Sequence, residues 1–212
     1  MKDSTNGTEI PELLKAVIEL LKVHRVAFQQ ERPYRRAIGL FFAELFSFAR
    51  HNITQELLTL GITSGDWSAW YRLFSRPRYD EAVLAQCLLK ETLEQVDEDE
   101  PYCVAVDSTS IHRSSLRMPG TSWLRDSRFS AFRPGIHRAQ RFVHGAWLTP
   151  LEAGYSRAIP LRFLPAFPPK AVAAQAPAEK EWEAGVHFLS WLRENLDQLG
   201  RTKEYVLALA DG

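Results

Sequence analysis

Two aspartates each follow an apolar run, and the two runs lie far apart in the sequence. Asp107 follows "YCVAV" (102–106) and Asp211 follows "YVLALA" (205–210). Two carboxylates held close together repel each other unless a cation neutralises them. Carboxylate oxygens suit Mg²⁺ or Mn²⁺, and two such ions about 4 Å apart can activate water for phosphodiester displacement. If the fold brings Asp107 and Asp211 together, the sequence predicts a metal site for phosphoryl transfer.

An aspartate is also common where a strand ends in a turn, so either residue alone is compatible with a plain turn. The pair makes the stronger prediction, because two apolar runs deliver a carboxylate in the same way. Aspartate side chains more than about 10 Å apart could not share a metal site. The chain would then be a helix-plus-sheet domain of unrelated function.

Four apolar runs in the second half of the chain predict the strands that would position these aspartates. They cover residues 102–109, 141–151, 155–167 and 205–212. A short turn at 152–154 makes the middle two a hairpin, so three antiparallel strands are expected. Residues 111–140 are polar and rich in Arg and Ser, and we expect a long loop there.

An amphipathic helix is predicted between the hairpin and the last strand, at residues 179–200. Gly200 follows its end, and its apolar face consists of Trp182, Val186, Leu189, Leu192 and Leu196. A strand–helix–strand crossover is right-handed and can place the final strand beside and parallel to the first. Asp107 and Asp211 would then be neighbours, with the final strand buried and its outer edge open.

The first hundred residues show helical periodicity. Helix starts are marked by Thr8 with Pro11, by Pro33 and by Asp80, and shorter helices are expected at about 53–60 and 66–74. The acidic stretch "DEDEP" (97–101) then marks a boundary. We expect a helical, DNA-binding region at residues 1–100 and a catalytic region at 101–212.

Composition sets ordinary bounds on the class of protein. The 212 residues are 45% hydrophobic and 25% charged with zero net charge, so the overall charge predicts no partner. Cys87 and Cys103 lack metal-ligand spacing and are interpreted as buried, reduced thiols of a cytoplasmic protein. The N-terminus lacks the apolar core of a signal peptide, and no apolar stretch reaches membrane-spanning length.

The predicted loop combines many arginines with a single acid, Asp126. Such a loop beside a metal site suits contact with phosphates, and the interleaved Trp123, Phe129 and Phe132 can stack on unpaired bases. The alternative is a solvated loop whose aromatic side chains pack on the core. The arginines expected to contact DNA are Arg113, Arg117, Arg125, Arg128, Arg133 and Arg138.

The stretch "ITQELLTLGITSGDWSAWYRLFSR" (53–76) has the character of a helix-turn-helix, with Gly61 at the turn. The second helix would then meet the major groove and bring Arg72 to the DNA. Equally, Trp70, Leu73 and Phe74 can belong to the core of a helical bundle.

Two other chemistries find no support in the sequence. His137 and His144 have no Cys or carboxylate at ligand spacing, so a zinc site is not predicted. The serines near Asp107 are not in a "GxSxG" elbow, which argues against a serine hydrolase.

The chain resembles bacterial insertion-sequence transposases of the DDE type, which have a ribonuclease H-like catalytic core. The resemblance runs from about residue 35 over most of the chain. Its matching stretches are "FARHNITQELLTLGITSGDWSAWYRLFSRPRYD" (48–80), "VAVDST" (104–109), "HGAWL" (144–148) and "LALADG" (207–212). It implies a mixed α+β fold, in which a helical N-terminal region precedes a ribonuclease H-like α/β domain.

The resemblance also implies chemistry and partners. Asp107 on the first core strand and Asp211 at the end of the fourth would be catalytic and would ligate Mg²⁺ or Mn²⁺. The partner would be DNA at transposon ends, bound by a homodimer, and the reaction would be metal-dependent strand cleavage followed by strand transfer.

The family's third acidic residue is a Glu on a later helix, and no counterpart precedes residue 212. The fifth strand of the core is also missing, so the sequence is interpreted as truncated after the second Asp motif. The alternative to a transposase is a catalytically inactive DNA-binding fragment, or an inhibitor of a full-length transposase. That alternative predicts DNA binding that survives Asp107→Ala, without metal-dependent cleavage.

Overall fold

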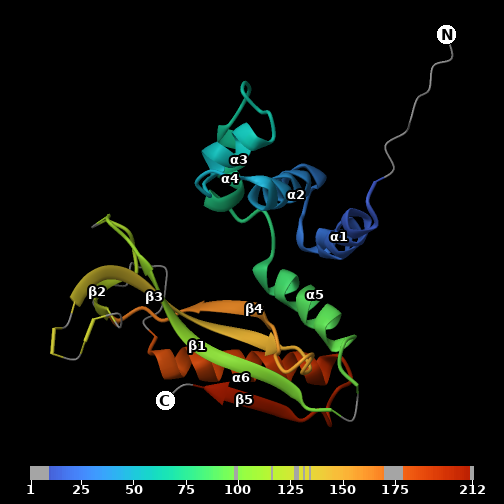
Figure 1. The fold of residues 1–212 in the computed structure, drawn as a ribbon, viewed down its shortest axis with the longest axis vertical. Coiled ribbons are helices and arrows are strands. Elements are labelled where there is room, and N and C mark those ends of the chain that lie inside the picture. The colour runs from blue at the N-terminus through green and yellow to red at the C-terminus, as the bar shows by residue number, and fades with distance from the viewer. Residues whose placement is uncertain are drawn as a thin grey trace. The chain divides into compact units, whose positions relative to one another are not determined.

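A computed structural model describes residues 10–97, 100–115, 117–126, 129–130, 132–133, 135–169 and 179–210. The chain forms two compact units, Met1–Leu88 and Leu89–Gly212, which we describe in turn (Figure 1). None of the helices in these ranges is long and apolar enough to span a membrane. Cys87 and Cys103 form no disulfide; Cys87 is buried, as predicted, whereas Cys103 is only partly buried.

The N-terminal unit is helical, as the periodicity predicts. Residues Phe28, Leu40, Leu57 and Leu73 form its buried core. The predicted cap at Asp80 is present, since its Oδ1 accepts hydrogen bonds from the backbone N–H groups of Ala82 and Val83. Thr8 lies outside the described residues. The elements are α1 (Glu12–Val23), η1 (His24–Ala27), α2 (Glu31–Phe46), α3 (Ile53–Thr59), α4 (Ser68–Ser75) and α5 (Glu81–Leu93), the last of which crosses into the second unit.

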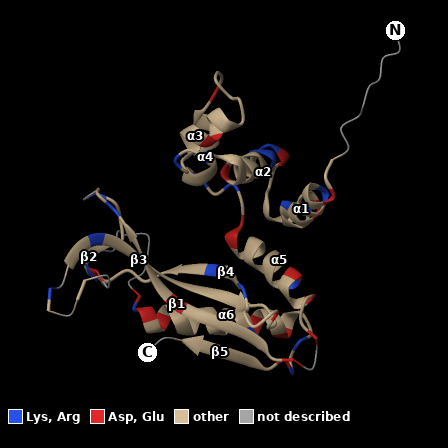
Figure 2. Ribbon diagram, in the orientation of Figure 1, with Lys and Arg blue, Asp and Glu red and all other residues tan. Residues whose placement is uncertain are grey.

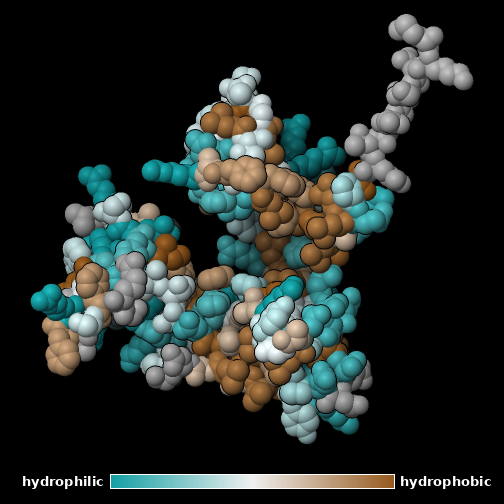
Figure 3. Space-filling model, in the orientation of Figure 1, coloured by the Kyte–Doolittle hydropathy of each residue, from teal (hydrophilic) through white to brown (hydrophobic). Residues whose placement is uncertain are grey.

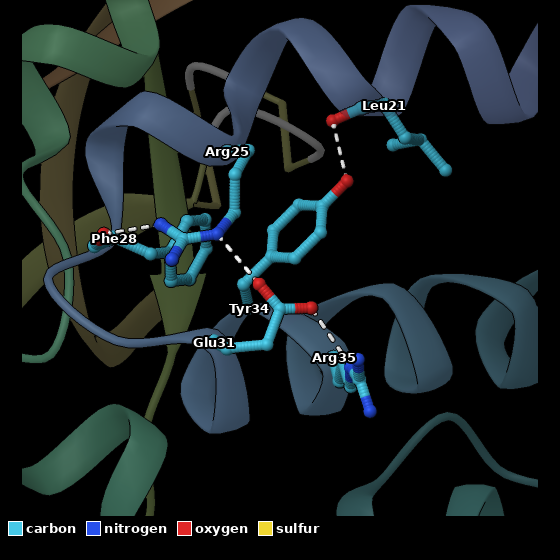
Figure 4. A network of polar contacts seen from close by, with 6 residues as sticks. All are labelled: Leu21, Arg25, Phe28, Glu31, Tyr34 and Arg35. Atoms are coloured by element: carbon cyan, nitrogen blue, oxygen red, sulfur yellow. Dashed lines mark hydrogen bonds and ion pairs between the residues drawn. The ribbon is translucent and has the colours of Figure 1, made fainter.

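A polar network joins η1 to the start of α2 (Figure 4). Arg25 and Arg35 each donate from Nε to the carboxylate of Glu31 at 2.8 Å. These hydrogen bonds hold the pKa of Glu31 below its usual range, and the one from Arg35 has the larger effect. Arg25 also donates to the carbonyl of Phe28 at 2.6 Å, and the Tyr34 hydroxyl donates to the carbonyl of Leu21 at 3.2 Å. The network therefore fixes the turn between the first two helices.

Helices α3 and α4 are joined by a turn at Gly61, as the helix-turn-helix pattern predicts. Gly61 has a φ of 72°, a conformation that glycine adopts without strain. Trp70 packs against the backbone of Gly39 on α2, and Leu73 is buried. The inner face of α4 therefore belongs to the core of the unit, whereas Phe74 is exposed.

The C-terminal unit is a five-stranded mixed sheet with one long helix. Strands occur in the order β2-β3-β1-β5, and β4 also pairs with β3. Every pair is antiparallel except β1 and β5. This arrangement confirms the predicted mixed α+β class. The elements are β1 (Tyr102–His112), β2 (Thr121–Asp126), β3 (Gly135–Leu148), β4 (Ala158–Pro165), α6 (Glu181–Gln198) and β5 (Val206–Ala210).

The long loop predicted for residues 111–140 is wrong. Strand β1 continues to His112, and this stretch also holds β2 and the first part of β3. One face of β2 is exposed and carries Trp123 and Arg125, so the stretch contains no apolar run for a strand prediction to detect. Backbone pairing of β2 with β3, from Thr121↔Gln140 to Asp126↔Gly135, makes the strand all the same.

Helix α6 covers one face of the sheet (Figure 1). At the closest approach, a Cβ on Gly145 of β3 would lie only 2.1 Å from the Phe188 ring, so only glycine fits there. The buried face of α6 includes Ala184, Phe188 and Leu192. Only part of the predicted apolar face is buried, because Trp182 is 65% exposed and Val186 is 51% exposed.

Strand β5 lies parallel to β1, in a register that runs from Tyr102↔Val206 to Val106↔Ala210. The predicted crossover is thus confirmed. Within the described part of the chain β5 pairs with β1 alone, so its outer edge is open. The expectation that this strand is buried is wrong, because Leu207 and Leu209 are about half exposed at the edge of the sheet.

Candidate active site

Asp107 lies on β1 directly after Val106 and is exposed to solvent. Its Oδ1 accepts a hydrogen bond from the backbone N–H of Ser108 at 2.7 Å. Among the described residues no cationic side chain forms an ion pair with it. An exposed carboxylate of this kind is a hard oxygen donor and fits a Mg²⁺ or Mn²⁺ ion.

The second predicted ligand, Asp211, lies outside the described residues. The residue before it, Ala210, is the register partner of Val106, the residue before Asp107. Neighbouring strands lie about 4.8 Å apart. The described structure therefore brings the two chain segments that lead into the aspartates side by side.

His144 on β3 is the cross-strand partner of Asp107, so the two side chains share one face of the sheet. Its ring stacks on Phe163 of β4 with the centroids 5.3 Å apart. Its Nδ1 is buried and has no hydrogen-bond partner within the described chain. Sequence reasoning noted the "HGAWL" motif but gave His144 no role, because the position facing a strand residue depends on register.

An apolar cavity of about 430 Å³ opens beside the middle of β1, at residues 106–108. Its floor comes from Val106 and Val143 of the sheet, and its wall from Val186 and Leu189 of α6. Brown, apolar surface gathers over this α6 and β5 part of the unit in Figure 3. Asp107 and Ser108 also line this cavity, so it borders the candidate site.

The predicted DNA-binding arginines divide into two groups. Arg117, Arg125 and Arg133 are exposed at the β2 end of the sheet, where Figure 2 shows several Lys and Arg positions. Arg113 and Arg138 are partly buried and make structural contacts, Arg113 to Gln140 at 2.9 Å and Arg138 to Thr121. Arg128 lies outside the described residues.

Residues of the β2–β3 pair continue the sheet face that carries Asp107. Counting back from His144 in steps of two along β3, this face reaches Arg138, whose cross-strand partner is Trp123. At about 3.4 Å per residue, Arg138 lies roughly 20 Å from His144. Trp123 is 66% exposed and Arg125 lies on the same face. A basic, aromatic surface thus extends from the strand that neighbours Asp107.

Arg72 of the N-terminal unit donates to Asp66 and to Ser68, each at 2.8 Å. It lines a second cavity, of about 310 Å³, together with three more arginines, Arg32, Arg36 and Arg78. The cavity is lined by four arginines and one carboxylate, that of Asp66, so its net charge is positive. A positively charged cavity suits a phosphate.

Comparison with known proteins identifies the family. A family model described as DDE superfamily endonuclease matches residues 27–211, which includes both predicted aspartates. No curated protein and no solved structure matches the chain. The family implies a nuclease-type function on DNA, and its members typically use divalent metal ions. With the match extending over most of its length, the chain belongs to the DDE superfamily endonuclease family.

Proposed function

We propose that the chain carries two carboxylates of a metal-dependent site for DNA transposition, Asp107 and Asp211. The observation that carries the proposal is the parallel register of β1 and β5. If that register continues by one residue beyond Val106↔Ala210, Asp107 and Asp211 would be paired. Such a pair is what the family's nuclease chemistry requires.

Mg²⁺ or Mn²⁺ bound by these carboxylates would supply activation of the attacking oxygen and stabilisation of the leaving oxygen. The chain's own residues prepare the site. The Ser108 N–H orients the Asp107 carboxylate through its 2.7 Å hydrogen bond. The stacked rings of His144 and Phe163 lie beside Asp107 on the same face of the sheet.

The DNA would lie along the basic and aromatic surface formed by Trp123, Arg125 and the neighbouring Arg117 and Arg133. Exposed arginines neutralise phosphates, and Trp123 can stack on an unpaired base near a cut end. The full proposal is cleavage at the ends of an insertion sequence and strand transfer by a homodimer on DNA. It puts the chain at the bacterial nucleoid, where the substrate is.

A plasmid-nicking assay tests this function. Purified chain with Mg²⁺ or Mn²⁺ should convert supercoiled DNA carrying the transposon end to the nicked form, and a chelator should stop the reaction. Asp107→Asn should lower the rate by about 100-fold or more, because a carboxylate ligand is lost. Glu194→Gln, at an exposed acid on α6, is the matched control and should cleave like the wild type.

Nicking that survives Asp107→Asn, or that does not need metal, would contradict the proposal. DNA binding without any metal-dependent nicking would favour the second candidate, a non-catalytic DNA-binding or inhibitory chain. The arginine-lined cavity around Arg72 is the observation that supports this second candidate. Its binding would survive Asp107→Ala and fall on Arg72→Ala.

A further inference from the structure

Three side chains that can bind a transition metal meet at the β2 end of the sheet. His112 ends β1, Asp126 ends β2, and His137 lies near the start of β3. Their ligand atoms all lie within 4.8 Å of one another. The strand registers explain the meeting, because His112↔Ala139 and Leu124↔His137 put all three side chains on one face of the sheet.

Two side chains of this cluster, Asp126 and His137, have little solvent exposure, which is unusual for polar side chains. The Asp126 side chain is only 6% exposed and the His137 side chain 15% exposed. Both ring nitrogens of His137 are buried and have no hydrogen bond within the described chain. A buried polar atom without a partner costs about 1–3 kcal/mol. A ligand that accepts the imidazole lone pair would remove that cost.

The geometry suits a metal ion better than a simple ion pair. His137 Nδ1 lies 3.5 Å from Asp126 Oδ2, which is long for a hydrogen bond between these groups. The His112 and His137 rings stack with their centroids 3.9 Å apart and their planes at 8°. Donor atoms around a tetrahedral zinc ion are about 3.3 Å apart, so the cluster must contract by about 1.5 Å or less.

One adjustment is needed for binding. Parallel rings do not aim their nitrogens at a common point, so one imidazole must turn. His112 is exposed at the end of β1 and can turn about its side-chain bonds, whereas Asp126 and His137 are held in the interior. The preformed part of the site is therefore the buried pair, and His112 completes it.

We propose that His112, Asp126 and His137 bind a transition-metal ion of the Zn²⁺ class. Two imidazoles and one carboxylate are ligands that favour zinc over Mg²⁺, which prefers oxygen alone. The ion joins the end of β1 to the β2–β3 pair that carries Trp123 and Arg125. This site is separate from the one at Asp107 and does not depend on the proposed DNA cleavage.

Cobalt titration tests this site on the full chain, purified without a polyhistidine tag and stripped by a chelator. We expect the visible bands of four-coordinate Co²⁺, saturating at one ion per chain and bleached by added Zn²⁺. His112→Ala and Asp126→Asn should each weaken binding at least about tenfold, since even outer-sphere substitutions cost that much. His112 is exposed, so its replacement leaves the packed interior intact.

Two controls make the result specific. His187→Ala removes an exposed imidazole on α6 and should leave the cobalt bands unchanged. Zn²⁺ should also raise the thermal unfolding temperature of the wild type, and should do so far less for His112→Ala. The inference fails if the wild type binds no cobalt, or if His112→Ala and Asp126→Asn bind it as tightly as the wild type.

Discussion

The orientation and surroundings of the Asp107 carboxylate depend on neighbouring residues. Its carboxylate is oriented by the Ser108 N–H, its sheet face is shared with His144, and its backbone borders an apolar cavity. The aspartate itself could be predicted from the sequence, because an apolar run delivers it. Its pairing with His144 could not, because cross-strand register emerges only when β1 and β3 are aligned.

The buried Glu56 on α3 is expected to make the stability of the N-terminal helices depend on pH. The residue is 8% exposed, and burial raises its pKa, helped by the neighbouring carboxyl of Glu44. A raised pKa means that the folded state holds the proton more tightly than the unfolded chain, whose glutamates titrate near about 4.3. The stabilisation is therefore full below that pH and is lost as the pH rises through the folded pKa.

Glu56→Gln should accordingly raise the thermal unfolding temperature of the N-terminal helices at pH 7 and flatten its dependence on pH. Circular dichroism melts between about pH 4 and pH 7 measure this effect. Glu19→Gln, which alters an exposed ion pair with Lys22, serves as the control and should change little. A lower unfolding temperature for Glu56→Gln at pH 7 would show that burial does not set the titration of Glu56.

At the scale of elements, the contact between α6 and β3 holds the sheet beneath the candidate site. Gly145 lies under the Phe188 ring, and a Cβ there would come within 2.1 Å of it. Gly145→Ala should therefore push α6 away and cost about 1–3 kcal/mol of unfolding free energy, the range for overpacked cores. Urea denaturation measures the loss.

The compensating variant Gly145→Ala with Phe188→Leu should recover part of that stability, because the shorter side chain makes room for the methyl group. A matched control is Gly154→Ala, where nothing lies within 4 Å but φ is +87°, so only backbone strain of about 1 kcal/mol is expected. If Phe188→Leu recovers no stability in the Gly145→Ala background, the Phe188 contact is not what requires glycine at residue 145.

Some strands and helices of the second unit can be predicted from the sequence, and others cannot. β1, α6 and the parallel β5 follow from apolar runs and helical periodicity. β2 and the start of β3 are not predicted, because one of their faces carries Trp123, Arg125 and Arg138 in place of an apolar run. The metal-binding cluster was missed for a related reason, since His112, Asp126 and His137 meet only through strand pairing. Ligand spacing along the chain therefore gave no sign of it.

At the scale of the whole chain, family membership and sheet topology both support the site proposed at Asp107. The family match covers residues 27–211, and the β1–β5 register brings side by side the segments that lead into the two predicted aspartates. The proposed Zn²⁺-class site lies at the C-terminal end of β1, five residues beyond Asp107. The two proposed sites differ in their ligands, with carboxylate oxygens at Asp107 and Asp211 and two imidazoles with one carboxylate at the β2 end.

Whether Asp107 and Asp211 share a metal ion can be measured by manganese binding, followed by the electron paramagnetic resonance of free Mn²⁺. One equivalent of Zn²⁺ is added first, so that the histidine cluster is filled. The wild-type chain should lower the free Mn²⁺ signal, and Asp107→Asn and Asp211→Asn should each weaken binding by about tenfold or more, because either change removes one of the two carboxylates. Manganese binding as tight in either variant as in the wild type, or none in the wild type, would contradict a shared site at Asp107 and Asp211.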